Sequence, residues 1–138
     1  MDYYIQKNSR NLFFYFFLWV IYGGIIIFLS SLPGNKINKF FFFKGQDKIL
    51  HCFEYSLYAF LTYIFFQLLY SFKKNHVKLI AIGYSLLFAL LEELHQMYVP
   101  GRSCSPFDFL ADSVGVFVGI FIFYRIFILI EHKNRKKQ

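Results

Sequence analysis

The stretch LFFYFFLWVIYGGIIIFLSSL, residues 12–32, decides the fold class because it contains no charged side chain. A helix needs roughly 20 residues to cross the hydrocarbon core of a bilayer, which is about 30 Å thick. Lys7 and Arg10 precede the stretch, as in a signal peptide, but its apolar run is longer than the usual signal core. We therefore expect a retained membrane helix here and not a cleaved leader.

The composition extends this expectation to the whole chain. Of 138 residues, 57% are hydrophobic and 24% are aromatic, which is too apolar for an ordinary soluble domain of this size. The net charge of +7 could suggest nucleic acid, but the basic residues lie between apolar runs and do not gather on one water-facing surface. We expect no nucleic-acid partner. Cys52 and Cys104 stand in no metal-binding spacing, which excludes a zinc finger and a disulfide-rich scaffold.

Three further apolar runs follow the first, at residues 48–70, 77–96 and 106–130. The run at 77–96 reaches membrane length only with its polar tail, because residues 77–91 alone would rise about 22 Å. The hydrophilic segments between the runs are too short to form a second domain. The sequence therefore predicts an all-α, polytopic membrane bundle of four transmembrane helices, with residues 1–138 as a single domain.

The charges in the tails and loops predict the orientation of this bundle. Nine Lys and Arg lie in the two tails and in the loop between the second and third runs, against five in the other two loops. Because basic residues concentrate on the cytoplasmic side, we expect both termini to be cytoplasmic. The segment Lys39–Lys44, with four Phe between two Lys, is typical of an aromatic stretch in the outer membrane interface.

Unusual polar residues concentrate at one end of this predicted bundle. With four spans, the start of the second helix, the end of the third and the start of the fourth lie on the same, extracytoplasmic side. The residues on that side are Asp47, Lys48, His51, Tyr55, Glu92, Glu93, Gln96, Arg102, Ser103, Asp108 and Asp112. Many of them recur every three or four residues and therefore share a helix face. Since ionisable groups are costly in lipid unless paired or hydrated, we expect them to surround a wet pocket one to two turns deep.

Some of these residues also have a structural interpretation. Asp47 could cap the second helix, and Asp108 could form a capping box with Ser105. Gly115 and Gly119 form a Gly-x-x-x-Gly face, which we interpret as close helix packing.

The deeper acids favour a functional interpretation. Glu92 and Glu93 end a helix, where acids oppose the helix dipole, so as structural residues they would need Arg102 as a partner. Asp112 lies a turn deeper than any capping role reaches. The sequence therefore indicates that these acids serve a binding or catalytic site.

Three motifs in this order resemble the VanZ-like family of bacterial membrane proteins. They are Asp47-Lys48-Ile49-Leu50-His51-x-x-Glu54-Tyr55, Glu92-Glu93-Leu94-His95-Gln96-x-x-Val99-Pro100-Gly101-Arg102-Ser103 and Asp108-x-x-x-Asp112-x-x-Gly115-x-x-x-Gly119. The resemblance implies a multi-pass protein of the bacterial cytoplasmic membrane. The namesake of the family is associated with teicoplanin resistance, and the resemblance implies an envelope role rather than that particular phenotype.

The predicted pocket combines acid, base and anion-binding groups. Arg102 could hold a phosphate or carboxylate in bidentate fashion. Glu93 and Asp112 are the first choices for a catalytic acid and base, with His51 as a proton shuttle held in one tautomer by Asp47. The other polar residues would bind the ligand: Asp47, Lys48, Tyr55, Glu92, Gln96, Arg102, Ser103 and Asp108. The same carboxylates could instead bind Mg²⁺ or Ca²⁺, which prefer oxygen ligands.

Three classes of function remain open on the sequence. The favoured one is a site for a membrane lipid, namely a phosphate-bearing or anionic envelope lipid or a lipid-linked glycan. The second is a membrane-embedded hydrolase or transferase that acts on such a lipid through Glu93, Asp112 and His51. The third, a small cation or proton transporter, is disfavoured because the opposite halves of the helices offer few polar residues beyond Gln67, Tyr63 and Ser85. The ligand and the oligomeric state stay open.

Overall fold

The computed structural model describes residues 2–37, 42–43, 45–69 and 74–135. Over these residues it contains α1 (Asp2–Ser30), the short α2 (Gly34–Ile37), α3 (Gln46–Leu69), α4 (Lys74–Gln96) and α5 (Pro106–Arg135), and no strand. The all-α prediction is confirmed. The long helices match the four predicted runs but extend beyond them at several ends, most of all at the start of α1. The predicted interface segment Lys39–Lys44 lies largely outside the described residues.

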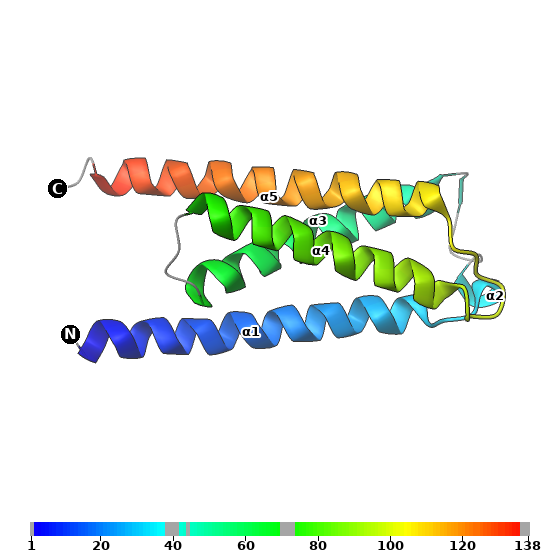
Figure 1. The fold of residues 1–138 in the computed structure, drawn as a ribbon, viewed down its shortest axis with the longest axis horizontal. Coiled ribbons are helices and arrows are strands. Elements are labelled where there is room, and N and C mark those ends of the chain that lie inside the picture. Colours follow the sequence, from blue (N-terminus) through cyan, green and yellow to red (C-terminus); the bar gives the residue numbers. More distant parts are fainter. Residues whose placement is uncertain (1, 38–41, 44, 70–73, 136–138) are drawn as a thin grey trace.

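The long helices lie side by side along one axis, and α3 contacts each of the other three (Figure 1). The beginning of α1 and the end of α5 lie at one end of the bundle, whereas α2 and the loop between α4 and α5 lie at the other (Figure 1). We call this second end, with α2 and residues 97–105, the polar end. The end of α1, the start of α3, the end of α4 and the start of α5 all meet there.

Two segments in the described part of the chain are long and apolar enough to cross a membrane, Asn11–Ser30 and Gln46–Leu69. Many large apolar side chains on these helices point outward, and Phe28 of α1 and Phe53 of α3 are 65% and 71% exposed. Soluble monomers rarely expose contiguous apolar surface on this scale. The surface of the bundle therefore matches a lipid environment.

Close contact between α3 and α5 depends on two glycines. A Cβ atom added to Gly115 would lie 2.2 Å from the carbonyl oxygen of Cys52, and one added to Gly119 would lie 2.0 Å from that of Ser56. No side chain fits at either position, because a real carbon atom cannot approach a carbonyl oxygen so closely. The Gly-x-x-x-Gly face is thus a packing surface, as the sequence indicated.

Aromatic side chains fill the middle of the bundle between α1, α3 and α4. The rings of Tyr58 and Phe88 stack with centroids 4.5 Å apart, and those of Trp19 and Phe65 stack at 5.0 Å. The indole nitrogen of Trp19 donates a hydrogen bond to Thr62 Oγ1 at 2.9 Å, which satisfies both polar groups away from water. This aromatic layer lies between the polar end and the opposite end of the bundle.

Candidate functional site

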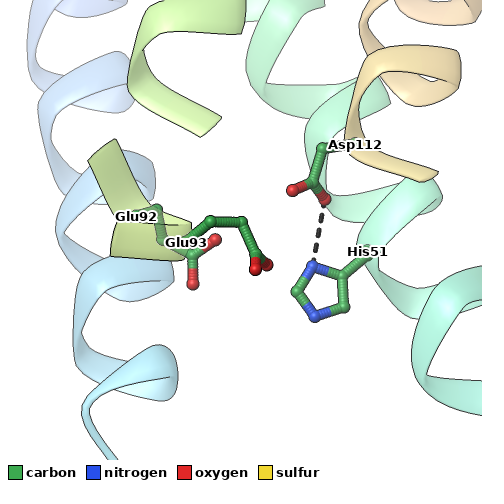
Figure 2. Close-up of side chains that lie close together, drawn as sticks. All are labelled: His51, Glu92, Glu93 and Asp112. Atoms are coloured by element: carbon green, nitrogen blue, oxygen red, sulfur yellow. Dashed lines mark hydrogen bonds and ion pairs between the residues drawn. The ribbon is translucent and has the colours of Figure 1, made fainter. Parts of the chain in front are cut away.

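Four ionisable side chains from three helices converge below the polar end. His51 comes from α3, Glu92 and Glu93 come from α4, and Asp112 comes from α5 (Figure 2). One ligand atom from each residue can be chosen so that all four lie within 4.8 Å of one another. Glu93 and Asp112 are completely buried, and Glu92 is 5% exposed. We call these residues the four-residue cluster.

His51 and Asp112 make the closest contact in this cluster, with His51 Nδ1 3.0 Å from Asp112 Oδ1. The expectation that Asp47 orients the imidazole is therefore wrong. Asp47 lies one turn earlier in α3, and its carboxylate pairs with the neighbouring Lys48 at 2.8 Å. A residue on another helix thus takes the orienting role that helical spacing alone assigned to Asp47.

Lys48 joins the starts of α3 and α5. Its ammonium group lies 2.8 Å from Asp47 Oδ2 and 2.6 Å from Asp108 Oδ1. The carboxylate of Asp108 therefore forms an ion pair between helices, and its backbone N–H donates to the carbonyl oxygen of Ser105 at 2.9 Å. These three charges lie at the rim of the polar end, and they hold α3 against α5 above the four-residue cluster.

Neighbouring groups hold the two glutamates in place. The hydroxyl group of Tyr55 donates to Glu92 Oε2 at 3.4 Å, and the side-chain amide of Gln96 donates to Glu92 Oε1. The backbone N–H of Ser105 donates to Glu93 Oε2 at 2.9 Å. Ser105 lies in the loop between α4 and α5, so helical periodicity does not reveal this last contact. Tyr55 and Gln96 thus lie beside the cluster, as expected from their spacing of four residues from His51 and Glu92.

Two carboxylate oxygens in the cluster have no hydrogen-bond partner among the described residues. They are Glu93 Oε1 and Asp112 Oδ2, and both atoms are buried. A buried anionic oxygen without a partner is costly, so such atoms usually mark a bound ligand, ion or water. The cluster therefore has two buried acceptor oxygens that a ligand could use.

Arg102 does not pair with Glu92 or Glu93, contrary to the structural interpretation of these acids. Its Nη2 and Nε donate to the carbonyl oxygens of Leu29 and Leu32, at 3.1 and 3.3 Å. Carbonyl groups at the C-terminus of a helix lack partners within the helix, so the guanidinium group caps α1. The adjacent Ser103 is exposed and lies outside the four-residue cluster.

A groove of about 420 Å³ runs along the bundle between α1 and α3 and reaches the polar end. Apolar side chains form most of its wall, and its polar end carries charged or ionisable groups. Its lining residues are Tyr22, Ile25, Leu29, Leu32, Asp47, Leu50, His51, Phe53, Glu54 and Arg102. His51 thus belongs to both the groove and the four-residue cluster, so the two are connected. We call this feature the α1–α3 groove.

A second groove of about 420 Å³ lies between α4 and α5. Its lining residues are Lys78, Ile82, Phe117, Val118, Ile120 and Phe121, and none of them is acidic. It therefore matches the α1–α3 groove in size, but Lys78 is the one charged residue among the described residues of its lining.

Cys52 and Cys104 are both free. The pKa of the Cys104 thiol lies above its ordinary value, because desolvation and the negative charge of Glu93 disfavour the thiolate. Since the thiolate is the reactive form, this environment does not activate Cys104 as a nucleophile.

These features define an all-helical membrane protein with a buried histidine–carboxylate cluster at one end of its bundle. The chain belongs to the VanZ/LLP1 family, whose family model matches residues 9–129. The matched range includes all four residues of the cluster, and it confirms the resemblance seen in the three motifs. No curated protein and no solved structure matches the chain.

Proposed function

We propose that the protein is a four-span component of the bacterial cytoplasmic membrane that binds a phosphate-bearing envelope lipid, or a lipid-linked glycan, at its polar end. Both termini are cytoplasmic in this proposal, so the polar end is extracytoplasmic. The α1–α3 groove is the observation that carries the proposal. Its apolar wall suits acyl chains, and its end at Asp47, His51 and Arg102 suits a polar headgroup.

The charges around the groove indicate how an anionic headgroup would bind. Arg102 uses Nε and Nη2 to cap α1, and among the described residues its Nη1 makes no hydrogen bond, which leaves donors for a phosphate oxygen. Lys48 adds a second cation near the same rim. The cluster beneath them is strongly acidic, so a phosphate would be repelled unless a cation or protons offset the carboxylates.

Filling the α1–α3 groove tests this proposal. Leu50 lines the groove and is 47% exposed, so a Leu50→Trp change occupies the groove without disturbing the core. We expect lipid retention from extracted bacterial lipids, measured by native mass spectrometry, to fall about tenfold, a loss of about 1.4 kcal/mol. Val118→Trp is the matched control, because Val118 is 41% exposed and lines the second groove. Equal lipid retention by the two variants would contradict the proposed site.

A second candidate function is a hydrolase or transferase that acts on the same lipid. The contact between His51 and Asp112, together with the unpartnered Glu93 Oε1, favours it, because a base with an orienting carboxylate and a free acid is a catalytic arrangement. A mass change in the retained lipid over time, abolished by Glu93→Gln and Asp112→Asn in folded protein, would establish this function. Turnover that survives both changes would exclude these residues as its catalysts.

A further inference from the structure

We propose that the four-residue cluster binds one divalent transition-metal ion, such as Mn²⁺ or Zn²⁺, through His51, Glu92, Glu93 and Asp112. This site goes beyond lipid binding, and it would stand even if the α1–α3 groove held no lipid.

The donor atoms determine the class of metal. Mg²⁺ and Ca²⁺ favour sites made of oxygen atoms, whereas an imidazole nitrogen combined with carboxylates suits Mn²⁺, Fe²⁺ or Zn²⁺. The cluster supplies one imidazole and three carboxylates from three helices. The participation of His51 therefore favours a transition metal over the Mg²⁺ or Ca²⁺ that the carboxylates alone suggested.

The spacing of the donor atoms fits one ion. Ligands bound at about 2.1 Å lie about 3.0 Å apart when adjacent in an octahedron and about 4.2 Å apart when opposite. One donor atom from each of the four residues lies within 4.8 Å of the donor atoms of the other three. A small inward movement of the longest pair would allow all four donors to bind one ion, with the remaining octahedral positions left for other ligands.

The unpartnered oxygens point independently to a ligand. Asp112 and Glu93 have no exposed surface, yet Asp112 Oδ2 and Glu93 Oε1 accept no hydrogen bond within the described part of the chain. Each residue uses its other oxygen in a contact with His51 or Ser105. These contacts orient the carboxylates and leave a free oxygen on each, which is the arrangement that supports a metal-bound carboxylate.

The surroundings also hold Glu92 in position. Tyr55 and Gln96 donate to its two oxygens, and both residues are buried. Carboxylates that bind a metal are commonly fixed by such hydrogen bonds, which lower the cost of ordering them when the ion arrives. His51 also lines the α1–α3 groove, so the groove reaches the cluster at this residue.

A bound cation would change what the groove can accept. Three carboxylates with one imidazole carry excess negative charge, and a divalent ion offsets most of it. If the proposed lipid function holds, this ion supplies the positive charge that a headgroup phosphate needs beside His51. Only this last step rests on the proposed function.

Manganese binding to the purified full-length protein in detergent tests the site. We expect one bound Mn²⁺ per chain by equilibrium titration followed with electron paramagnetic resonance. We also expect the pulsed spectrum to show nitrogen coupling from His51, and this coupling should disappear in His51→Gln. Glu93→Gln should weaken binding by more than about 10-fold, because changing even a hydrogen-bond partner of a metal ligand costs about 10- to 100-fold. His76→Gln is the matched control, because His76 is an exposed histidine near the start of α4 and lies outside the cluster.

Three results would overturn the metal site: no stoichiometric Mn²⁺, absence of nitrogen coupling in the wild-type protein, or equal weakening by Glu93→Gln and His76→Gln. Lipid retention, measured separately on metal-free and on Mn²⁺-loaded protein, distinguishes a failure of this inference from a failure of the proposed function. Stoichiometric metal with no retained lipid would support the cluster and contradict the groove, whereas retained lipid without metal would do the reverse.

Discussion

Glu93→Gln is expected to stabilise the metal-free protein and to destabilise it relative to wild type when Mn²⁺ is present. Glu93 is completely buried, one of its oxygens accepts from the Ser105 N–H, and its other oxygen has no partner among the described residues. Glutamine keeps an acceptor for Ser105, removes a buried charge and adds donors near the oxygens of Glu92 and Asp112. We expect a gain of about 1–3 kcal/mol in unfolding free energy without metal.

Metal binding should make the wild-type protein more stable than Glu93→Gln. A ligand that binds only the folded state at 100 times its Kd stabilises it by about 2.7 kcal/mol, and Glu93→Gln should lose most of this gain. Thermal unfolding in detergent, with EDTA and then with Mn²⁺, measures both effects. His76→Gln, which changes an exposed residue outside the cluster, should respond to Mn²⁺ as the wild type does. If Glu93→Gln lowered the unfolding temperature equally with and without metal, the carboxylate would be a structural support for the loop at Ser105.

Gly119→Ala is expected to destabilise the bundle strongly, because the added Cβ would lie 2.0 Å from the carbonyl oxygen of Ser56. This contact involves backbone atoms, so α3 and α5 must separate to relieve it. Overpacking of this kind costs about 1–3 kcal/mol, and the rigid backbone partner places this case at the upper end. Separation would also disturb the cluster, since His51 and Asp112 lie on the same two helices.

Gly83→Ala and Gly24→Ala are matched controls for this prediction. Both glycines lie within long helices, and nothing is within 4 Å of the Cβ that alanine would add. Alanine is a better helix former than glycine by about 1 kcal/mol, so these changes should leave the unfolding temperature unchanged or raise it. A similar loss in Gly119→Ala and Gly83→Ala would show that the α3–α5 contact is not specially tight.

The long helices and their shared polar end could be predicted because each depends on a local pattern. Apolar runs of membrane length mark the helices, and spacing by three or four residues places Glu92 and Gln96 on one face. The short helix α2 was not predicted, because Gly34–Ile37 carries no periodic signal over its four residues. Four spans that alternate in direction were sufficient to predict that the polar residues lie at one end of the bundle.

The partners of these residues could not be predicted, because they depend on how the helices are rotated against one another. Periodicity along α3 placed Asp47 beside His51, yet the helix packing brings Asp112 to the imidazole and leaves Asp47 with Lys48. Arg102 was expected to hold a phosphate or carboxylate in bidentate fashion. Its Nε and Nη2 instead cap α1, because the carbonyl groups that end that helix lie within their reach, and among the described residues Nη1 is left for an anion.

The α1–α3 groove also escaped prediction from the sequence. Its wall uses residues of α1 such as Tyr22, Ile25 and Leu29, which lie in a run without charges. Nothing in that run distinguishes a side chain that lines a groove from one that faces lipid. The rotation of α1 against α3 decides this, and the hydroxyl group of Tyr22, which donates to the carbonyl oxygen of Glu54 at 3.2 Å, helps to hold it.

Headgroup selectivity tests the central claim most directly. Native mass spectrometry would compare retention of a phosphatidic acid and of a diacylglycerol with identical acyl chains, so that the phosphate is the only difference. We expect the wild-type protein to retain the phosphatidic acid at least tenfold better, a difference of about 1.4 kcal/mol. Leu50→Trp should lose this preference and Val118→Trp should keep it. Equal retention of the two lipids by the wild-type protein, or a preference that survives Leu50→Trp, would contradict a phosphate-binding site at the polar end.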